Sequence, residues 1–265
     1  MAQLAISKAR LFLIAAAVVL LSIALWLFLP PSVSSSAQLS TSDEAIERGE
    51  YLVIAGGCIS CHRGEEDEES FVGGLALETD FGTFFAPNIT PDMETGIGSW
   101  QAEDFLLALK HGRTPGGSFY YPAFPFRAYA GLSDQDVVDI GSYLMSLDPI
   151  ANSVPAAQTP PWLNRWAMAG WNLMADISEV EYEAFDDDLV ERGAYLARNL
   201  GHCSECHTPR NSLGILDARR EFAGATLGED VIEAIDAAAM EEWTAFDLDL
   251  FLLLGLKPDG DFAGG

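Results

Sequence analysis

Apolar and polar positions divide the chain into one long apolar stretch and, after it, segments with helical periodicity. Residues 11–29 contain no charged side chain, whereas later segments place apolar residues three and four positions apart. That spacing puts the apolar side chains on one face of a helix. The clearest case begins at Ser133, runs to about Ser146 and has an apolar face made of Val137, Ile140, Tyr143 and Leu144. The pattern therefore predicts a helical chain behind an apolar N-terminal segment.

The apolar stretch 11–29 is long enough to cross a bilayer as a helix, whereas the apolar core of a cleaved signal peptide is usually shorter. Lys8 and Arg10 precede it, and a basic flank stays on the cytoplasmic side. We therefore expect residues 1–32 to be a single-pass anchor in the lipid of the bacterial cytoplasmic membrane, with the rest of the chain in the periplasm. The alternative is a signal peptide cleaved near Ala37, which would also export the chain.

An internal repeat organises the remaining residues. The pattern Glu-Arg-Gly-x-Tyr-Leu occurs at 47–52 and again at 191–196, and Trp100 and Trp243 each open a leucine-rich helix. Because both patterns recur in the same order, the repeat indicates that one module has been duplicated. The second copy has no counterpart of the helix that begins at Ser133, so we expect it to be truncated. The predicted domains are module 1 at 43–148, a linker with a Trp-rich helix at 149–185, and module 2 at 186–265.

All four cysteines lie in two copies of Cys-x-x-Cys-His, at 58–62 and 203–207. This is the attachment signature of c-type haem, in which two thiols form thioethers with porphyrin vinyl groups and the adjacent imidazole becomes the proximal iron ligand. We therefore expect two covalently bound haem c groups. The expected thioether residues are Cys58, Cys61, Cys203 and Cys206, and the expected axial iron ligands are His62 and His207.

Two other kinds of site use the same cysteine pairs. One zinc ion could take both pairs as ligands, but they are 145 residues apart, 203 minus 58, and each has its own local repeat. A thioredoxin-like dithiol would follow a βαβ pattern, and the sequence shows none. The motif therefore favours haem over zinc or dithiol chemistry.

The charge balance limits the kinds of macromolecule that the chain can bind. With 40 acidic and 14 basic residues the net charge is −26, which argues against nucleic acid. The acidic runs at 65–69 and 186–188 either steer a basic redox partner or simply form a solvated surface.

Four further motifs specify a family. They are Arg48-Gly49-Glu50-Tyr51-Leu52, Asn88-Ile89-Thr90-Pro91 with Thr95-Gly96-Ile97-Gly98, Tyr121-Pro122-Ala123-Phe124-Pro125, and Gly201-His202-Cys203 continued by Cys206-His207-Thr208-Pro209-Arg210-Asn211. From Ala45 onward the chain resembles the diheme, membrane-anchored c-type cytochromes related to the cytochrome subunits of bacterial alcohol and sugar-acid dehydrogenases. The resemblance implies an all-α fold of two cytochrome c modules. It also implies electron transfer from a dehydrogenase or a quinol-oxidising complex to a terminal oxidase or another cytochrome.

The sequence departs from that family at three places. Phe124 stands where many relatives carry the methionine that is the sixth iron ligand, and it cannot coordinate iron. The chain stops at Gly264-Gly265, before the corresponding ligand and closing helix of module 2. The stretch 228–242 replaces the Asn-Ile-Thr-Pro loop of module 1 with what its alanines and acids predict to be a helix.

These departures leave two functional hypotheses. The first is an electron carrier with no catalytic residue of its own, and the second is a diheme enzyme, peroxidase-like or thiosulfate-oxidising, that uses an open iron face. His111 is a candidate distal ligand of the first haem. Arg48, Arg192 and Arg210 are candidates to bind haem propionates, because a guanidinium matches a carboxylate in geometry.

Overall fold

The computed structural model describes residues 8–64, 69–180, 182, 184–228 and 230–263 and divides them into two compact units. Unit 1 comprises the described residues of Met1–Ile177 and Ala184–His202, and unit 2 those of Ser178–Glu183 and Cys203–Gly265. Most of the acidic run at 65–69 lies outside the described residues.

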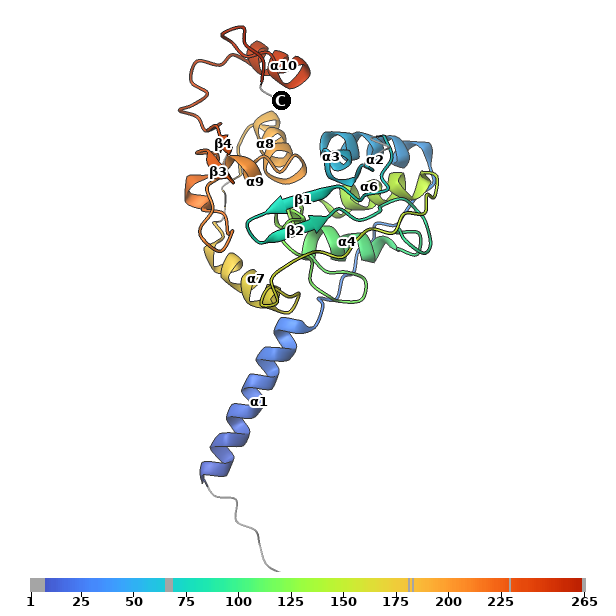
Figure 1. Cartoon of the computed structure of the whole chain (residues 1–265), viewed down its shortest axis with the longest axis vertical. Coiled ribbons are helices and arrows are strands. Elements are labelled where there is room, and N and C mark those ends of the chain that lie inside the picture. Colours follow the sequence, from blue (N-terminus) through green and yellow to red (C-terminus); the bar gives the residue numbers. More distant parts are fainter. Residues whose placement is uncertain (1–7, 65–68, 181, 183, 229, 264–265) are drawn as a thin grey trace, which may run out of the picture. The chain divides into compact units, whose positions relative to one another are not determined.

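The core of unit 1 is built around the first Cys-x-x-Cys-His motif, from the helix that contains it and from helices that precede and follow it (Figure 1). These are α2 (Asp43–Ala55), α3 (Cys58–His62), α4 (Ala102–His111), α5 (Phe126–Tyr129) and α6 (Asp134–Ser146). Side chains from α2, α4 and α6 form one buried cluster that includes Leu52, Phe105, Val137, Ile140 and Leu144. Ser133 caps α6 through its hydroxyl, which accepts from Asp136 N–H, so the predicted start of this helix is confirmed.

Helices α2 and α6 cross at very short range. A Cβ added to Gly49 of α2 would lie 2.0 Å from the main-chain oxygen of Asp139 in α6. Only a glycine permits this approach, because any side chain would overlap the facing backbone. Beside the crossing, Arg48 Nε donates to Asp139 Oδ2 at 2.9 Å. The buried Asp139 carboxylate therefore forms an ion pair with the guanidinium.

The expectation of an all-α fold is wrong, because the described residues include two antiparallel hairpins. In unit 1, β1 (Ala76–Thr79) pairs with β2 (Gly82–Phe85), and in unit 2, β3 (Ala225–Leu227) pairs with β4 (Asp230–Ile232). Figure 1 shows β1 and β2 side by side. Strands of three or four residues are too short for an alternating pattern to stand out in the sequence.

The expected membrane anchor is also corrected. Among the residues whose placement is described, no helix has the length and apolar character needed to span a bilayer. Helix α1 (Lys8–Phe28) includes Lys8 and Arg10, the two cations that the sequence analysis placed before the apolar stretch. The predicted single-pass anchoring, the lipid contact and the periplasmic location that depended on it are therefore not supported.

The C-terminal end of α1 is bound to unit 1. Arg113 donates to the carbonyl of Leu27 at 3.0 Å, and the guanidinium lies 3.3 Å from the centroid of the Phe119 ring. The Phe28 ring contacts Phe119 and also Trp166, which precedes α7 (Ala167–Ser178). The Trp-rich segment of the predicted linker thus contributes to a second, smaller apolar cluster of this unit.

Two further elements of unit 1 lead toward the second haem motif. They are α8 (Asp188–Tyr195) and a π-helix, η1 (Leu196–Leu200). Asp187 caps α8 by accepting from Leu189 and Val190 N–H. The Tyr195 hydroxyl donates to Asp136 and accepts from the N–H of Ser133, so this segment is tied to the start of α6.

Unit 2 has little core of its own. It contains α9 (Ser204–His207), a 3-10 turn, η2 (Ala218–Arg220), the β3–β4 hairpin and α10 (Ala245–Leu254). The predicted helix at 228–242 is wrong, since its described residues form strand β4 and a series of turns. In α10, Leu252 is 80% exposed and Leu253 is 79% exposed. An apolar helix of this kind is normally buried.

Candidate haem attachment sites

The first Cys-x-x-Cys-His motif forms a helix of its own just after α2. Helix α2 ends at Ala55 and is followed by Gly56, whose N–H donates to Leu52 O, and by Gly57, which lies in the left-handed region with φ +63°. Helix α3 then runs from Cys58 to His62, so both cysteines and the histidine lie within five consecutive residues of one short helix.

A main-chain carbonyl fixes the His62 ring. His62 Nδ1 lies 2.8 Å from the oxygen of Pro87, which follows the β1–β2 hairpin. Because a carbonyl oxygen can only accept, Nδ1 carries the proton, and Nε2 of the neutral ring keeps its lone pair for a metal. Burial lowers the pKa of His62, which favours this neutral form.

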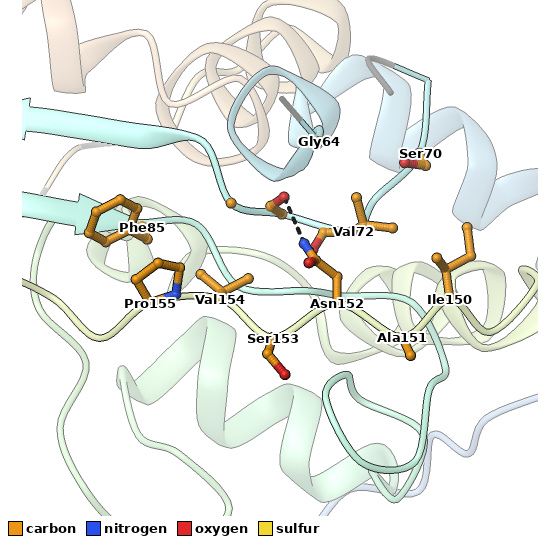
Figure 2. A pocket seen from close by; sticks show the side chains of 12 residues that line it. Gly64, Ser70, Val72, Phe85, Ile150, Ala151, Asn152, Ser153, Val154 and Pro155 are labelled. Atoms are coloured by element: carbon orange, nitrogen blue, oxygen red, sulfur yellow. Dashed lines mark hydrogen bonds between the residues drawn. The ribbon is translucent and has the colours of Figure 1, made fainter. Parts of the chain in front are cut away.

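A glycine turn supports the same histidine from its backbone. Gly73 N–H donates to His62 O at 2.8 Å, and a Cβ at Gly73, where φ is +69°, would lie 2.4 Å from Ala86 O. Asn152 reaches this turn from the predicted linker and donates to the carbonyl oxygens of Val72 at 3.0 Å and of Gly73 at 3.3 Å (Figure 2). These contacts lie at the wall of a cavity of about 450 Å³.

The second motif repeats this arrangement. His207 Nδ1 lies 2.7 Å from Glu233 O, just after the β3–β4 hairpin, and Gly224 N–H donates to His207 O at 2.8 Å. Gly224 has a φ of +79°, and a Cβ there would lie 2.9 Å from Ile232 O. Each histidine is therefore held by a glycine N–H at its carbonyl and by a carbonyl oxygen at its ring.

One position differs between the copies in a way that the sequence did not reveal. His202 occupies the left-handed conformation that Gly57 has in the first copy, with φ +39°. A non-glycine residue in this region costs roughly 1–2 kcal/mol. The ring of His202 packs edge-to-face on Tyr129 at 5.6 Å, a contact that offsets part of this cost.

Three of the four thiols have pKa values shifted in the direction opposite to that of a redox-active dithiol. Burial raises the pKa of Cys58 to about 12 and also raises the pKa values of Cys203 and Cys206. A redox-active Cys-x-x-Cys pair needs a thiol pKa below its ordinary value. All four cysteines are free of disulfides, and no group of three metal-binding side chains gathers within the described part of the chain. This donor set fits two c-type haems.

The candidate sixth-ligand region of the first copy is aromatic. The ring of Phe124 lies 5.4 Å from that of Tyr120 and 5.6 Å from that of Tyr129. His111 lies exposed in the last turn of α4, next to the ion pair of Lys110 with Asp134. Its assignment as a distal ligand stays a prediction.

The three candidate propionate-binding arginines have different surroundings. Arg48 pairs with Glu44 and Asp139, both at 2.9 Å. Arg192 stacks over the ring of Tyr195, with its guanidinium carbon 5.0 Å from the centroid. Arg210 donates to Gly214 O and Glu205 O, at 2.8 Å and 2.7 Å, and forms an ion pair with Glu205. Their role toward propionates stays a prediction.

Three residues of the site escaped sequence analysis because they act through backbone or amide groups. Pro87 and Glu233 contribute carbonyl oxygens, which every residue has, so only the position after a hairpin could have identified them. Asn152 lies in a stretch rich in proline and alanine that carried no recognisable signal.

Comparison with known proteins agrees with this donor set. The cytochrome c family model matches residues 46–148. A protein of Cereibacter sphaeroides named diheme cytochrome c-type is 42% identical over 248 residues, covering 91% of this chain and 83% of that protein.

Two similar proteins are subunits of dehydrogenases. The gluconate 2-dehydrogenase cytochrome c subunit of Pantoea cypripedii is 35% identical over 82% of this chain, and the fructose dehydrogenase cytochrome subunit of Gluconobacter japonicus is 36% identical over 83%. The chain spans about half the length of these two subunits, 49% and 47%.

Proposed function

The chain belongs to the family of diheme c-type cytochromes, and on that premise we propose that it transfers electrons as the cytochrome subunit of a dehydrogenase. When bound, a haem c supplies an iron that exchanges one electron at a time. The observation that carries the proposal is the repeated histidine geometry, with Nδ1 held by a carbonyl oxygen at 2.8 Å in one copy and 2.7 Å in the other.

Each motif would hold one haem. Cys58 and Cys61 would bind the first, and Cys203 and Cys206 the second. Each thiol would add across a vinyl double bond, with its sulfur bonding to one carbon and its hydrogen to the other, so that attachment would be redox-neutral. His62 and His207 would present Nε2 to the irons. The carbonyl bond at Nδ1 fixes the tautomer and ring orientation and raises the basicity of the ligand, as it does for histidines at other metal sites.

The proposed electron donor is a dehydrogenase, and the proposed acceptor is a downstream oxidase or cytochrome. The names of the two dehydrogenase subunits support this direction. The net charge of −26 favours a partner with a basic docking face, whose association would slow as salt is added.

Intact mass tests the proposal. The chain, produced together with the c-type haem attachment machinery, should exceed its polypeptide mass by two haems. The Cys58→Ala, Cys61→Ala variant and the Cys203→Ala, Cys206→Ala variant should each retain one. A wild-type mass without haem would rule out the cytochrome assignment, and a gain of one haem would rule out a diheme protein.

A second candidate function is substrate chemistry at an open iron face. It rests on Phe124, whose ring lies between Tyr120 and Tyr129 and cannot coordinate iron. Hydrogen peroxide turnover or thiosulfate oxidation by the two-haem protein would favour this candidate. Reversible reduction without turnover of either compound would favour the carrier.

A further inference from the structure

The linker segment 150–152 is hydrogen-bonded to both of the loops that hold His62. One loop contains Gly73, whose N–H donates to His62 O at 2.8 Å. The other contains Pro87, whose carbonyl oxygen lies 2.8 Å from His62 Nδ1. A segment that fixes both loops can therefore control how the imidazole is presented to an iron.

The loop that carries the Pro87 carbonyl is tied to the linker at the next residues. Asn88 and Thr90 are both buried. Asn88 Nδ2 donates to Ile150 O at 2.8 Å, and Thr90 Oγ1 accepts from Ile150 N–H at 3.2 Å. Breaking such bonds is costly, because buried polar groups would be left without partners. The Pro87 carbonyl is thus held in a loop that is fixed to the linker.

The glycine turn is tied to the linker by the Asn152 side chain. Its Nδ2 donates to Val72 O at 3.0 Å and to Gly73 O at 3.3 Å (Figure 2). The main-chain N–H of Asn152 separately donates to Thr95 Oγ1 at 2.9 Å. The backbone of the linker is therefore held independently of the Asn152 amide, and that amide holds the turn.

We propose that Asn152 is a positioning residue for the iron ligand His62 and that it lowers the reduction potential of the first haem. The inference rests on the proposed function, because it needs a haem at this motif. A carbonyl oxygen that accepts from Nδ1 makes the imidazole a stronger electron donor, and a stronger donor stabilises ferric iron. By fixing the turn that binds His62 O, Asn152 keeps the ring directed at Pro87 O.

A redox titration of the two-haem chain tests this role. Asn152→Ala removes the amide donor and keeps the backbone bond to Thr95. At a fixed potential it should raise the ratio of ferrous to ferric first haem about threefold. For one electron a tenfold change corresponds to about 59 mV, so the midpoint potential should rise by about 30 mV. The sum of the two midpoint potentials should rise equally, which requires no assignment of either potential to a haem.

Two further variants locate the effect. The chain with Cys203→Ala and Cys206→Ala, which should carry the first haem alone, should show the same rise when Asn152→Ala is added. Ser153→Ala is the matched control, because Ser153 is the next linker residue, is exposed, and turns its side chain away from Val72 (Figure 2). It should leave both potentials unchanged, and an equal rise in this variant would show that the Asn152 amide is not responsible.

Amide hydrogen exchange in the haem-loaded chain separates positioning from stability. The Gly73 N–H should exchange several-fold faster in Asn152→Ala, because its turn has lost a restraint. Faster exchange with unchanged potentials would reduce Asn152 to a structural role and overturn the proposal. A fall in potential would also overturn it. Water entering the adjacent cavity would cause such a fall, since water favours the more highly charged ferric haem.

Intact mass distinguishes failure of this inference from failure of the proposed function. A chain that carries no haem would overturn both. A chain with two haems whose potentials do not respond to Asn152→Ala would overturn the role of Asn152 and leave the cytochrome assignment in place.

Discussion

The two haem motifs hold their histidines with the same local hydrogen bonds, yet they are embedded in very different surroundings. Around the first, α2, α4 and α6 bury a large apolar cluster. In unit 2, the buried residues among those described are Thr208 and Ile215. Both histidine bonds are nevertheless present, with lengths of 2.8 Å and 2.7 Å. The geometry of each motif histidine is thus set by a short local segment, whereas the burial of its surroundings depends on helices distant in sequence.

The largest expected difference between the copies is at the helix crossing. Gly49→Ala should destabilise unit 1 by about 3 kcal/mol, because the new Cβ would overlap Asp139 O. Gly193→Ala should instead stabilise α8 by up to about 1 kcal/mol, since alanine favours an exposed helix. Amide hydrogen exchange in α2 and in α8 measures each effect where it arises. Equal destabilisation by both substitutions would show that Gly193 is covered in solution.

A smaller difference is expected at the glycine turns under the histidines. Gly73→Ala should cost about 2 kcal/mol and Gly224→Ala about 1 kcal/mol. Both need a positive φ, but the nearest oxygen is 2.4 Å from the first Cβ position and 2.9 Å from the second. Denaturant unfolding of the two-haem protein, followed at the haem bands, measures both. Gly116→Ala, at a position with φ in the ordinary range and no main-chain atom within 4 Å of its Cβ, is the control.

The smallest expected effect concerns the hydrogen bond that the Tyr195 hydroxyl of α8 donates to Asp136 of α6. Burial and the hydrogen bond to Asp136 raise the pKa of Tyr195. The stabilisation from this hydroxyl should therefore be complete below its ordinary pKa of about 10 and be lost as pH rises through the higher folded value. Tyr195→Phe should cost about 1 kcal/mol at pH 8 and less at pH 11. Urea unfolding at the two pH values measures this, and a loss that grew with pH would contradict the assignment.

The sequence predicted those features that depend on side-chain type at fixed spacing. The motif residues and the cap at Ser133 follow from local chemistry, and the structure has this cap. The hairpins were missed because their ladders are only three or four residues long. The predicted helix at 228–242 failed because helix propensity is a weak prior, and the segment instead forms strand β4 and the turn that presents Glu233 O to His207.

The π-helix η1 lies where the two copies of the repeat differ in length. Leu52 and Leu196 are 144 positions apart, whereas Cys58 and Cys203 are 145 apart, so the second copy has one residue more than the first between these points. That interval contains η1, and the corresponding part of the first copy is a regular α-helix that ends at Ala55. A π turn accommodates one extra residue without breaking the helix. The extra residue is therefore accommodated by the wider π turn, which lies between Tyr195 and the second Cys-x-x-Cys-His motif.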